Sequence, residues 1–197
     1  MRARPLLRLA APIALPLAVL FARPAPAAAA EPAPRHLIYL HGRIVQEQQS
    51  PRPRHPRFGH YELEAILSAF RERGLVVRGG IRPKTASVDE SAAEVADEVR
   101  RLLASGVPAD RVTIVGASMG ASIALGASSR LRKPELRVVL LGACLSASVR
   151  EMPGEGPSGR FLSIREASDE LTEPCAAWRS DGDPLLPLEA REILLHT

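Results

Sequence analysis

Residues 111 to 130 read RVTIVGASMGASIALGASSR, and they constrain the fold more than any other stretch of the chain. The apolar, β-branched run at 112–115 is typical of a buried strand, and a small-residue pattern of helical type begins soon after Gly116. Between them stands Ser118, in the pattern G-x-S-x-G that Gly116 and Gly120 complete. In a sharp strand-to-helix turn, side chains at the two glycine positions would collide with neighbouring backbone. The stretch therefore predicts a strand, a tight turn that presents the Ser118 hydroxyl, and a helix.

The helix expected after Ser118 has a chemical consequence. The first N–H groups of a helix have no partner within it, so they favour negative charge that develops nearby. This setting suits a serine nucleophile; the alternative is a glycine-rich turn without chemistry. Two other uses of the glycines around Ser118 are not supported, because no Gly-Lys-Ser/Thr follows as in a phosphate-binding loop and Gly116, Gly120 and Gly126 do not have the spacing G-x-G-x-x-G.

The first 30 residues have the composition of an export signal. Arg2, Arg4 and Arg8 are followed by an apolar stretch at 9–22 and by small residues at 25–30. We expect a secretory signal that is removed near residue 30, which leaves a domain at 31–197 in the periplasm or outside the cell. The alternative of a membrane anchor is disfavoured, because an apolar stretch of roughly 14 residues broken by prolines is too short to span about 30 Å of hydrocarbon.

The charge balance follows from the expected cleavage. The chain has 26 basic and 22 acidic residues, and residues 1–30 hold four of the basic ones and none of the acidic ones. The mature chain would carry 22 of each, so it has no positive excess to attract nucleic acid. We therefore expect neither a nucleic-acid partner nor stable membrane insertion after cleavage.

The chain has two cysteines, Cys144 and Cys175, and both belong to the part expected to be exported. Outside the cytoplasm such a pair is prone to oxidation, so a disulfide is predicted. Closing a loop of about 30 residues would stabilise the fold by roughly 3 to 4 kcal/mol in the chain-entropy model. Two buried free thiols are the alternative. We expect no metal site, because neither cysteine has a second ligand at close spacing.

The remaining chain alternates short apolar runs with helical patterns, without an internal repeat or a second domain. Alternation of this kind predicts an α/β fold of three αβα layers, with a mostly parallel sheet of about six strands. Two segments rich in proline or glycine, 43–60 and 145–159, are expected to be loops. Helical patterns lie at 61–74, at 87–106, where Ser87 and Glu90 have the spacing of a capping box, and after Ser118 up to 131. Strands are expected at 37–40, 75–77, 112–115, 136–141, 161–164 and 191–195.

A serine nucleophile needs a base to take its proton, and the base needs an acid to orient it. Asp169 is the best acid, since it follows the second strand expected after Ser118 and the carboxyl ends of parallel strands meet at one edge. An exposed turn carboxylate without a role is the alternative for this position. Glu170, Asp181 and Asp183 are weaker candidates for the acid.

Backbone N–H groups are expected to stabilise the oxyanion. One is that of Met119, directly after the serine, and the other is that of Arg43, which follows Gly42 at the end of the first strand. His41 is expected to hold the turn rather than to act as the base. Solvated or local hydrogen-bonding roles are expected for the other histidines of this half of the chain, which are His36, His55 and His60.

Three motifs together resemble the small secreted α/β-hydrolase family proteins of bacteria: YLHGR at 39–43, GASMG at 116–120 and SDE at 168–170. The resemblance covers residues 36–197. It implies an α/β-hydrolase fold and serine hydrolase chemistry, most often esterase activity on a small-molecule ester, with no cofactor.

Two segments bear on the expected substrate. Larger members of this family insert a helical cap where this chain has 145–159, so we expect no cap domain and an open pocket that favours small or exposed acyl esters. The segment 43–60 is expected to cover part of that pocket.

The chain departs from the family at its end. Members place the catalytic histidine in a loop after the last strand and follow it with a helix, whereas here only His196 and Thr197 follow 191–195. We expect a truncated form that lacks this histidine and is impaired as an enzyme, with His196 as the alternative base. A non-catalytic binding protein of the same fold is the main rival interpretation, and acyl transfer to an acceptor other than water is a third.

Overall fold

The computed structural model describes residues 33–143, 156–169 and 189–196, all of them within one compact unit, Pro32–Thr197. The predicted export signal lies outside these residues, and so do Cys144 and Cys175. Signal cleavage and the disulfide therefore stay predictions.

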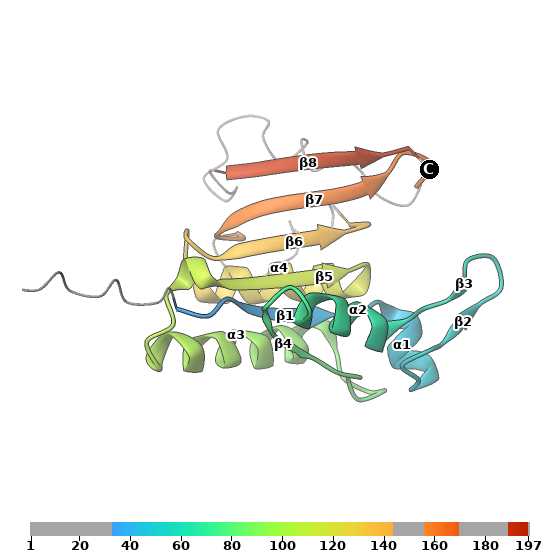
Figure 1. Ribbon diagram of the computed structural model, residues 1–197, viewed down its shortest axis with the longest axis horizontal. Coiled ribbons are helices and arrows are strands. Elements are labelled where there is room, and N and C mark those ends of the chain that lie inside the picture. The colour runs from blue at the N-terminus through green and yellow to red at the C-terminus, as the bar shows by residue number, and fades with distance from the viewer. Residues whose placement is uncertain (1–32, 144–155, 170–188, 197) are drawn as a thin grey trace, which may run out of the picture. The chain divides into compact units, whose positions relative to one another are not determined.

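The core of the fold is a six-stranded parallel sheet with the strand order β4-β1-β5-β6-β7-β8 (Figure 1). Each expected strand is present, and the three-layer α/β prediction is confirmed. Because all six strands run the same way, their carboxyl ends lie at one edge, where sites of parallel sheets form. The strands are β1 His36–Leu40, β4 Val76–Gly79, β5 Val112–Ala117, β6 Arg137–Leu141, β7 Arg160–Glu166 and β8 Glu189–Leu195.

Helices cover both faces of this sheet. Along β1, Ile38 and Leu40 join one buried cluster with residues of α3 and α4, whereas Leu37 and Tyr39 join a second cluster with residues of α1 and α2. This division follows from the alternation of side chains along a strand. Figure 1 shows α2 in front of the strands and α4 behind them. The helical segments are α1 Arg43–Gln48, α2 Leu63–Arg71, α3 Val88–Ala104, the short 3-10 helix η1 Ala109–Arg111, and α4 Met119–Leu131.

The capping box predicted at the start of α3 is confirmed. The Ser87 hydroxyl accepts a hydrogen bond of 3.1 Å from the Glu90 backbone N–H, and the Glu90 carboxylate accepts one of 2.9 Å from the Ser87 backbone N–H. Two of the unpaired donors at this helix end are thus satisfied. The apolar face of α3, with Val95 and Val99, then packs into the core.

The prediction that residues 43–60 form a loop is wrong. The segment contains α1 and a small antiparallel hairpin, β2 Arg54–His55 with β3 Gly59–His60. Helix α1 has only six residues, too few to show an apolar period. The prolines do not prevent order, because the carbonyls of Pro51 and Pro53 accept hydrogen bonds from Leu63 N (3.0 Å) and Tyr61 N (2.9 Å).

Two expectations lie partly or wholly beyond this description. Most of 145–159, the segment expected in place of a cap, is outside the described residues. Among the helices that are described, none combines the length and apolar character needed to cross a membrane.

Candidate active site

Ser118 occupies a strained turn between β5 and α4. Its backbone angles are φ 50° and ψ −118°, its residue is exposed, and it is the N-cap of α4. A non-glycine residue in such a region costs about 1 to 3 kcal/mol and persists only where its surroundings fix it. Here the Ser118 backbone N–H donates to the Leu141 carbonyl at 2.9 Å, and the Ser118 carbonyl accepts from Ala121 N at 2.7 Å. The serine therefore stands exposed at the carboxyl edge of the sheet.

The two glycines around Ser118 are required by packing, as predicted. A methyl group at Gly116 would overlap with the carbonyl of Gly120, and one at Gly120 would overlap with the carbonyl of Leu40 in β1. In both cases the obstacle is backbone, which cannot rotate away as a side chain can. Strand β1, strand β5 and helix α4 meet here at a distance that only glycine allows.

The backbone groups predicted to form the oxyanion hole lie on either side of Ser118. Met119 is the first residue of α4 and Arg43 the first residue of α1, so neither N–H has a partner within its helix. A methyl group at Gly42 would lie 3.6 Å from the Ser118 Cβ, which places the loop before Arg43 against the serine. The role of these N–H groups stays a prediction.

His41 is fully buried, and both of its ring nitrogens are engaged near its own loop. The Arg82 backbone N–H donates to Nε2 at 3.1 Å, so Nδ1 carries the proton and donates to the Gly42 carbonyl at 2.9 Å. The Arg82 guanidinium also donates to the His41 carbonyl at 2.6 Å. Burial holds the pKa of His41 below its ordinary value. The expected structural role of His41 is confirmed, and it is Arg82 that ties this loop to the segment after β4.

Tyr61 and Tyr39 also support this loop, and the sequence analysis missed both. Their hydroxyls are 2.5 Å apart, and burial raises the pKa of each. A backbone hydrogen bond with Gly42 partly offsets the rise in the pKa of Tyr61. The available signal was composition, since these are the chain's two tyrosines and one of them lies two residues before His41.

Asp169 lies at the same edge of the sheet, as predicted. It follows β7 and is half-buried, and its backbone N–H donates to the Glu166 carbonyl at 3.1 Å. A methyl group at Gly142 would lie 3.8 Å from its Oδ2. Because Gly142 directly follows Leu141, which accepts the hydrogen bond from Ser118, the end of β6 connects Ser118 and Asp169.

His196 directly follows β8 and is exposed. The Leu195 carbonyl accepts a hydrogen bond of 2.8 Å from Ala167 N, which places the end of β8 beside the turn that leads to Asp169. His55, in contrast, caps its own hairpin, because its Nδ1 accepts hydrogen bonds from the backbone N–H groups of Arg57 and Phe58 at 3.2 and 3.3 Å. The weaker acid candidates Glu170, Asp181 and Asp183 lie outside the described residues.

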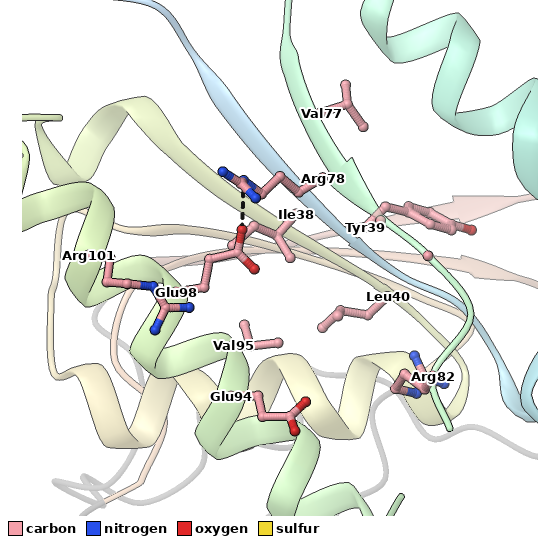
Figure 2. Close-up of a pocket in the computed structure, with 12 residues that line it drawn as sticks. Ile38, Tyr39, Leu40, Val77, Arg78, Arg82, Glu94, Val95, Glu98 and Arg101 are labelled. Carbon is pink, nitrogen blue, oxygen red and sulfur yellow. Dashed lines mark ion pairs between the residues drawn. The ribbon is translucent and has the colours of Figure 1, made fainter. Parts of the chain in front are cut away.

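A cavity of about 640 Å³ lies between β1, β4 and α3 and contains none of the predicted catalytic residues (Figure 2). Figure 2 shows Arg78 of β4 paired with Glu98 of α3. The Arg78 Nε and the Glu98 Oε1 are 2.9 Å apart, and Glu94 and Arg101 also lie on α3. Charges of both signs share this cavity, so it has no clear preference for one sign of ligand. Within the described ranges, no group of three or more His, Cys, Asp or Glu side chains is placed to hold a metal ion.

Comparison with known proteins gives one family match. The model of the Phospholipase/Carboxylesterase family matches residues 78–155, which include Ser118 and make up less than half of the chain. No curated protein matches the chain. Several solved structures are similar to it, among them RedJ and MGS-M1. RedJ with a PEG molecule bound in the active site has 16% identity, 90% coverage of each chain and a TM-score of 0.46. MGS-M1, an alpha/beta hydrolase enzyme from a Medee basin deep-sea metagenome library, has 14% identity, covers 83% of this chain and 68% of its own, and has a TM-score of 0.45. The family match supports the α/β-hydrolase superfamily over the part of the chain that contains the Ser118 turn.

Proposed function

We propose that the protein is a serine hydrolase, an esterase that acts on small or exposed acyl esters. The observation that carries the proposal is the exposed Ser118 in its strained turn at the start of α4. The family match supports it, because the matched residues contain this turn. Residues 1–30 favour a location outside the cytoplasm, in the periplasm or the medium.

The reaction begins when Ser118 Oγ attacks the ester carbonyl carbon and a base takes the hydroxyl proton. The carbonyl oxygen becomes an oxyanion, which the N–H groups of Met119 and Arg43 stabilise. Loss of one such donor typically costs a factor of about 10² to 10³ in rate. The tetrahedral intermediate then expels the alcohol, which leaves with the proton held by the base. Water repeats the sequence on the acyl-enzyme and releases the acid.

Asp169 orients the base in this proposal. It needs to accept a hydrogen bond from the base and stabilise its charged form, and it lies at the edge of the sheet where Ser118 stands. We assign the base to His196, which directly follows β8. Replacement of His196 by alanine tests that residue directly: a rate unchanged from that of the native protein would exclude it.

The test uses the full chain and the p-nitrophenyl ester of butyric acid. Ser118→Ala should remove hydrolysis above the background rate, because no other residue replaces the nucleophile. Ser105→Ala is the matched control, since Ser105 is an exposed serine at the end of α3. Equal hydrolysis by Ser118→Ala and Ser105→Ala would contradict the proposal, as would a native protein that hydrolyses no ester.

A further inference from the structure

A small cavity lies beneath the β2–β3 hairpin, within the segment expected to be loop. Its volume is about 240 Å³ and its walls are mostly apolar. We call it the hairpin pocket and define it by the residues that line it: Ile44, His55, Phe58, Gly59, His60 and Tyr61.

The hairpin pocket adjoins the candidate active site. Ile44 follows Arg43, whose N–H is a predicted oxyanion donor, and Tyr61 forms a hydrogen bond with the Gly42 backbone. Gly42 in turn lies against Ser118, because a methyl group added at Gly42 would be 3.6 Å from the Ser118 Cβ. Figure 1 shows the hairpin beyond α1, on the side of the sheet to which the strand arrows point. The segment 42–44 is thus shared by both places, since Ile44 lines the pocket and Gly42 lies against Ser118.

The walls of the hairpin pocket are held in place. The Tyr61 hydroxyl is fixed by Tyr39, and its backbone N–H donates to the Pro53 carbonyl at 2.9 Å. The Phe58 ring stacks on His55 with ring centroids 4.8 Å apart, and the Arg57 guanidinium lies 5.2 Å from the Phe58 ring centroid.

Phe58 is nevertheless 74% exposed. A large aromatic ring that the hairpin keeps in solvent, at the wall of an apolar pocket, gains from contact with a hydrocarbon ligand. Ile44, half-buried on α1, offers apolar surface on the opposite element.

We propose that the hairpin pocket binds the hydrocarbon group of the ester, a short alkyl chain or a single ring. A cavity of about 240 Å³ with mostly apolar walls has room for a group of this kind. The proposal rests on the proposed esterase function and adds its substrate class: esters with one such apolar group, next to a carbonyl held at Ser118.

The first test measures kcat/KM of the full chain for p-nitrophenyl acetate and hexanoate. The hexanoate-to-acetate ratio should exceed one, and it should fall roughly tenfold in Phe58→Ala, which removes a wall. Ile44→Trp, which fills the pocket, should lower the ratio in the same way. Val76→Ala is the control, because Val76 is an exposed apolar residue at the opposite end of β4, and it should leave the ratio as in the native protein. Equal ratios in all four proteins, together with no effect of Phe58→Ala on a series of alkyl acetates, would overturn the proposal while leaving the esterase function intact.

The hydrocarbon group can belong to the acid or to the alcohol of the ester. A second series with ethyl, butyl and hexyl acetates separates the two. If the Phe58→Ala effect occurs in the acyl series, the pocket holds the acid, and if it occurs in the acetate series, the pocket holds the alcohol. An effect in neither series contradicts the proposal.

A binding measurement separates failure of the pocket from failure of the enzyme. In the Ser118→Ala protein, 1-hexanol should shift the NMR signals of Ile44 and Phe58 in a saturable way, and Ile44→Trp should abolish the saturation. Saturable binding, together with a native protein that hydrolyses no ester, would overturn the hydrolase and keep the pocket. Hydrolysis without saturable binding would overturn the pocket and keep the hydrolase.

Discussion

The two sides of the candidate site are built differently. On one side, Ser118 stands where β1, β5 and α4 meet, and the glycines beside it touch backbone on the next element. On the other side, Asp169 and His196 follow β7 and β8, and the apolar residues at the end of β8, Ile193, Leu194 and Leu195, are between 42% and 45% exposed. The packing dictates which residues the first side can have. On the second side, the described contacts place the chain but do not determine the residue type.

The largest effect is expected from a substitution on the second side of the site, at Asp169. Asp169→Asn should lower kcat for ester hydrolysis by about 10⁴, because an amide cannot orient and stabilise a charged base as a carboxylate does. The free energy of unfolding should change much less, since Asp169 is only half-buried. Rates with p-nitrophenyl butyrate and urea unfolding measure the two quantities.

The control for this prediction is Asp97→Asn, on the exposed face of α3, where the carboxylate pairs with Arg100. Both activity and stability should stay close to the native values. If Asp169→Asn and Asp97→Asn have equal kcat, Asp169 is not the orienting acid.

The next largest effect is expected on the first side of the site, at Gly120. Gly120→Ala should destabilise the fold by about 3 kcal/mol, because the added methyl group overlaps with the Leu40 carbonyl in the neighbouring strand. Gly80→Ala should have almost no effect, since a methyl group there has no atom within 4 Å. Urea denaturation measures both, and similar midpoints for the two variants would show that β1 and α4 are not in close contact.

The smallest effect is the contribution of His41, on the first side of the site, to the pH dependence of the free energy of unfolding. Burial keeps the pKa of His41 below its ordinary value of about 6.5, so below pH 6.5 the unfolded chain binds a proton that the folded protein does not. The free energy of unfolding should therefore fall as the pH decreases from 6.5 towards the folded-state pKa, by at most about 1.4 kcal/mol per pH unit from this group.

Replacement of His41 by glutamine should remove this part of the slope, whereas His60→Gln, at an exposed histidine, should keep it. The measurement is the free energy of unfolding at pH 7.5, 6.5 and 5.5 for the three proteins. Identical slopes would mean that His41 is protonated in the folded protein as readily as in the unfolded chain.

The comparison also explains what the sequence could predict. The Ser118 turn and the capping box depend on residues close in the chain, and their patterns were sufficient. The parallel sheet joins distant strands, but the alternation of strand and helix patterns along the chain predicts it. The support of the 41–43 loop was missed because its contacts join distant residues: Tyr39 and Tyr61 are 22 positions apart, and His41 and Arg82 are 41 apart. No local pattern encodes such pairs. The order within 43–60 was missed because α1 is short and the hairpin depends on carbonyls that bond to Tyr61 and Leu63.

The most direct measurement is the site of attachment of a fluorophosphonate to the folded full-length protein, found by peptide mass spectrometry. An activated nucleophile at the start of α4 predicts one adduct, on Ser118, that forms in buffer and is absent when the probe is added in urea. Exposed serines on other helices, such as Ser68 and Ser105, should stay unmodified. No adduct on Ser118, or the same extent of modification on Ser105, would contradict the account.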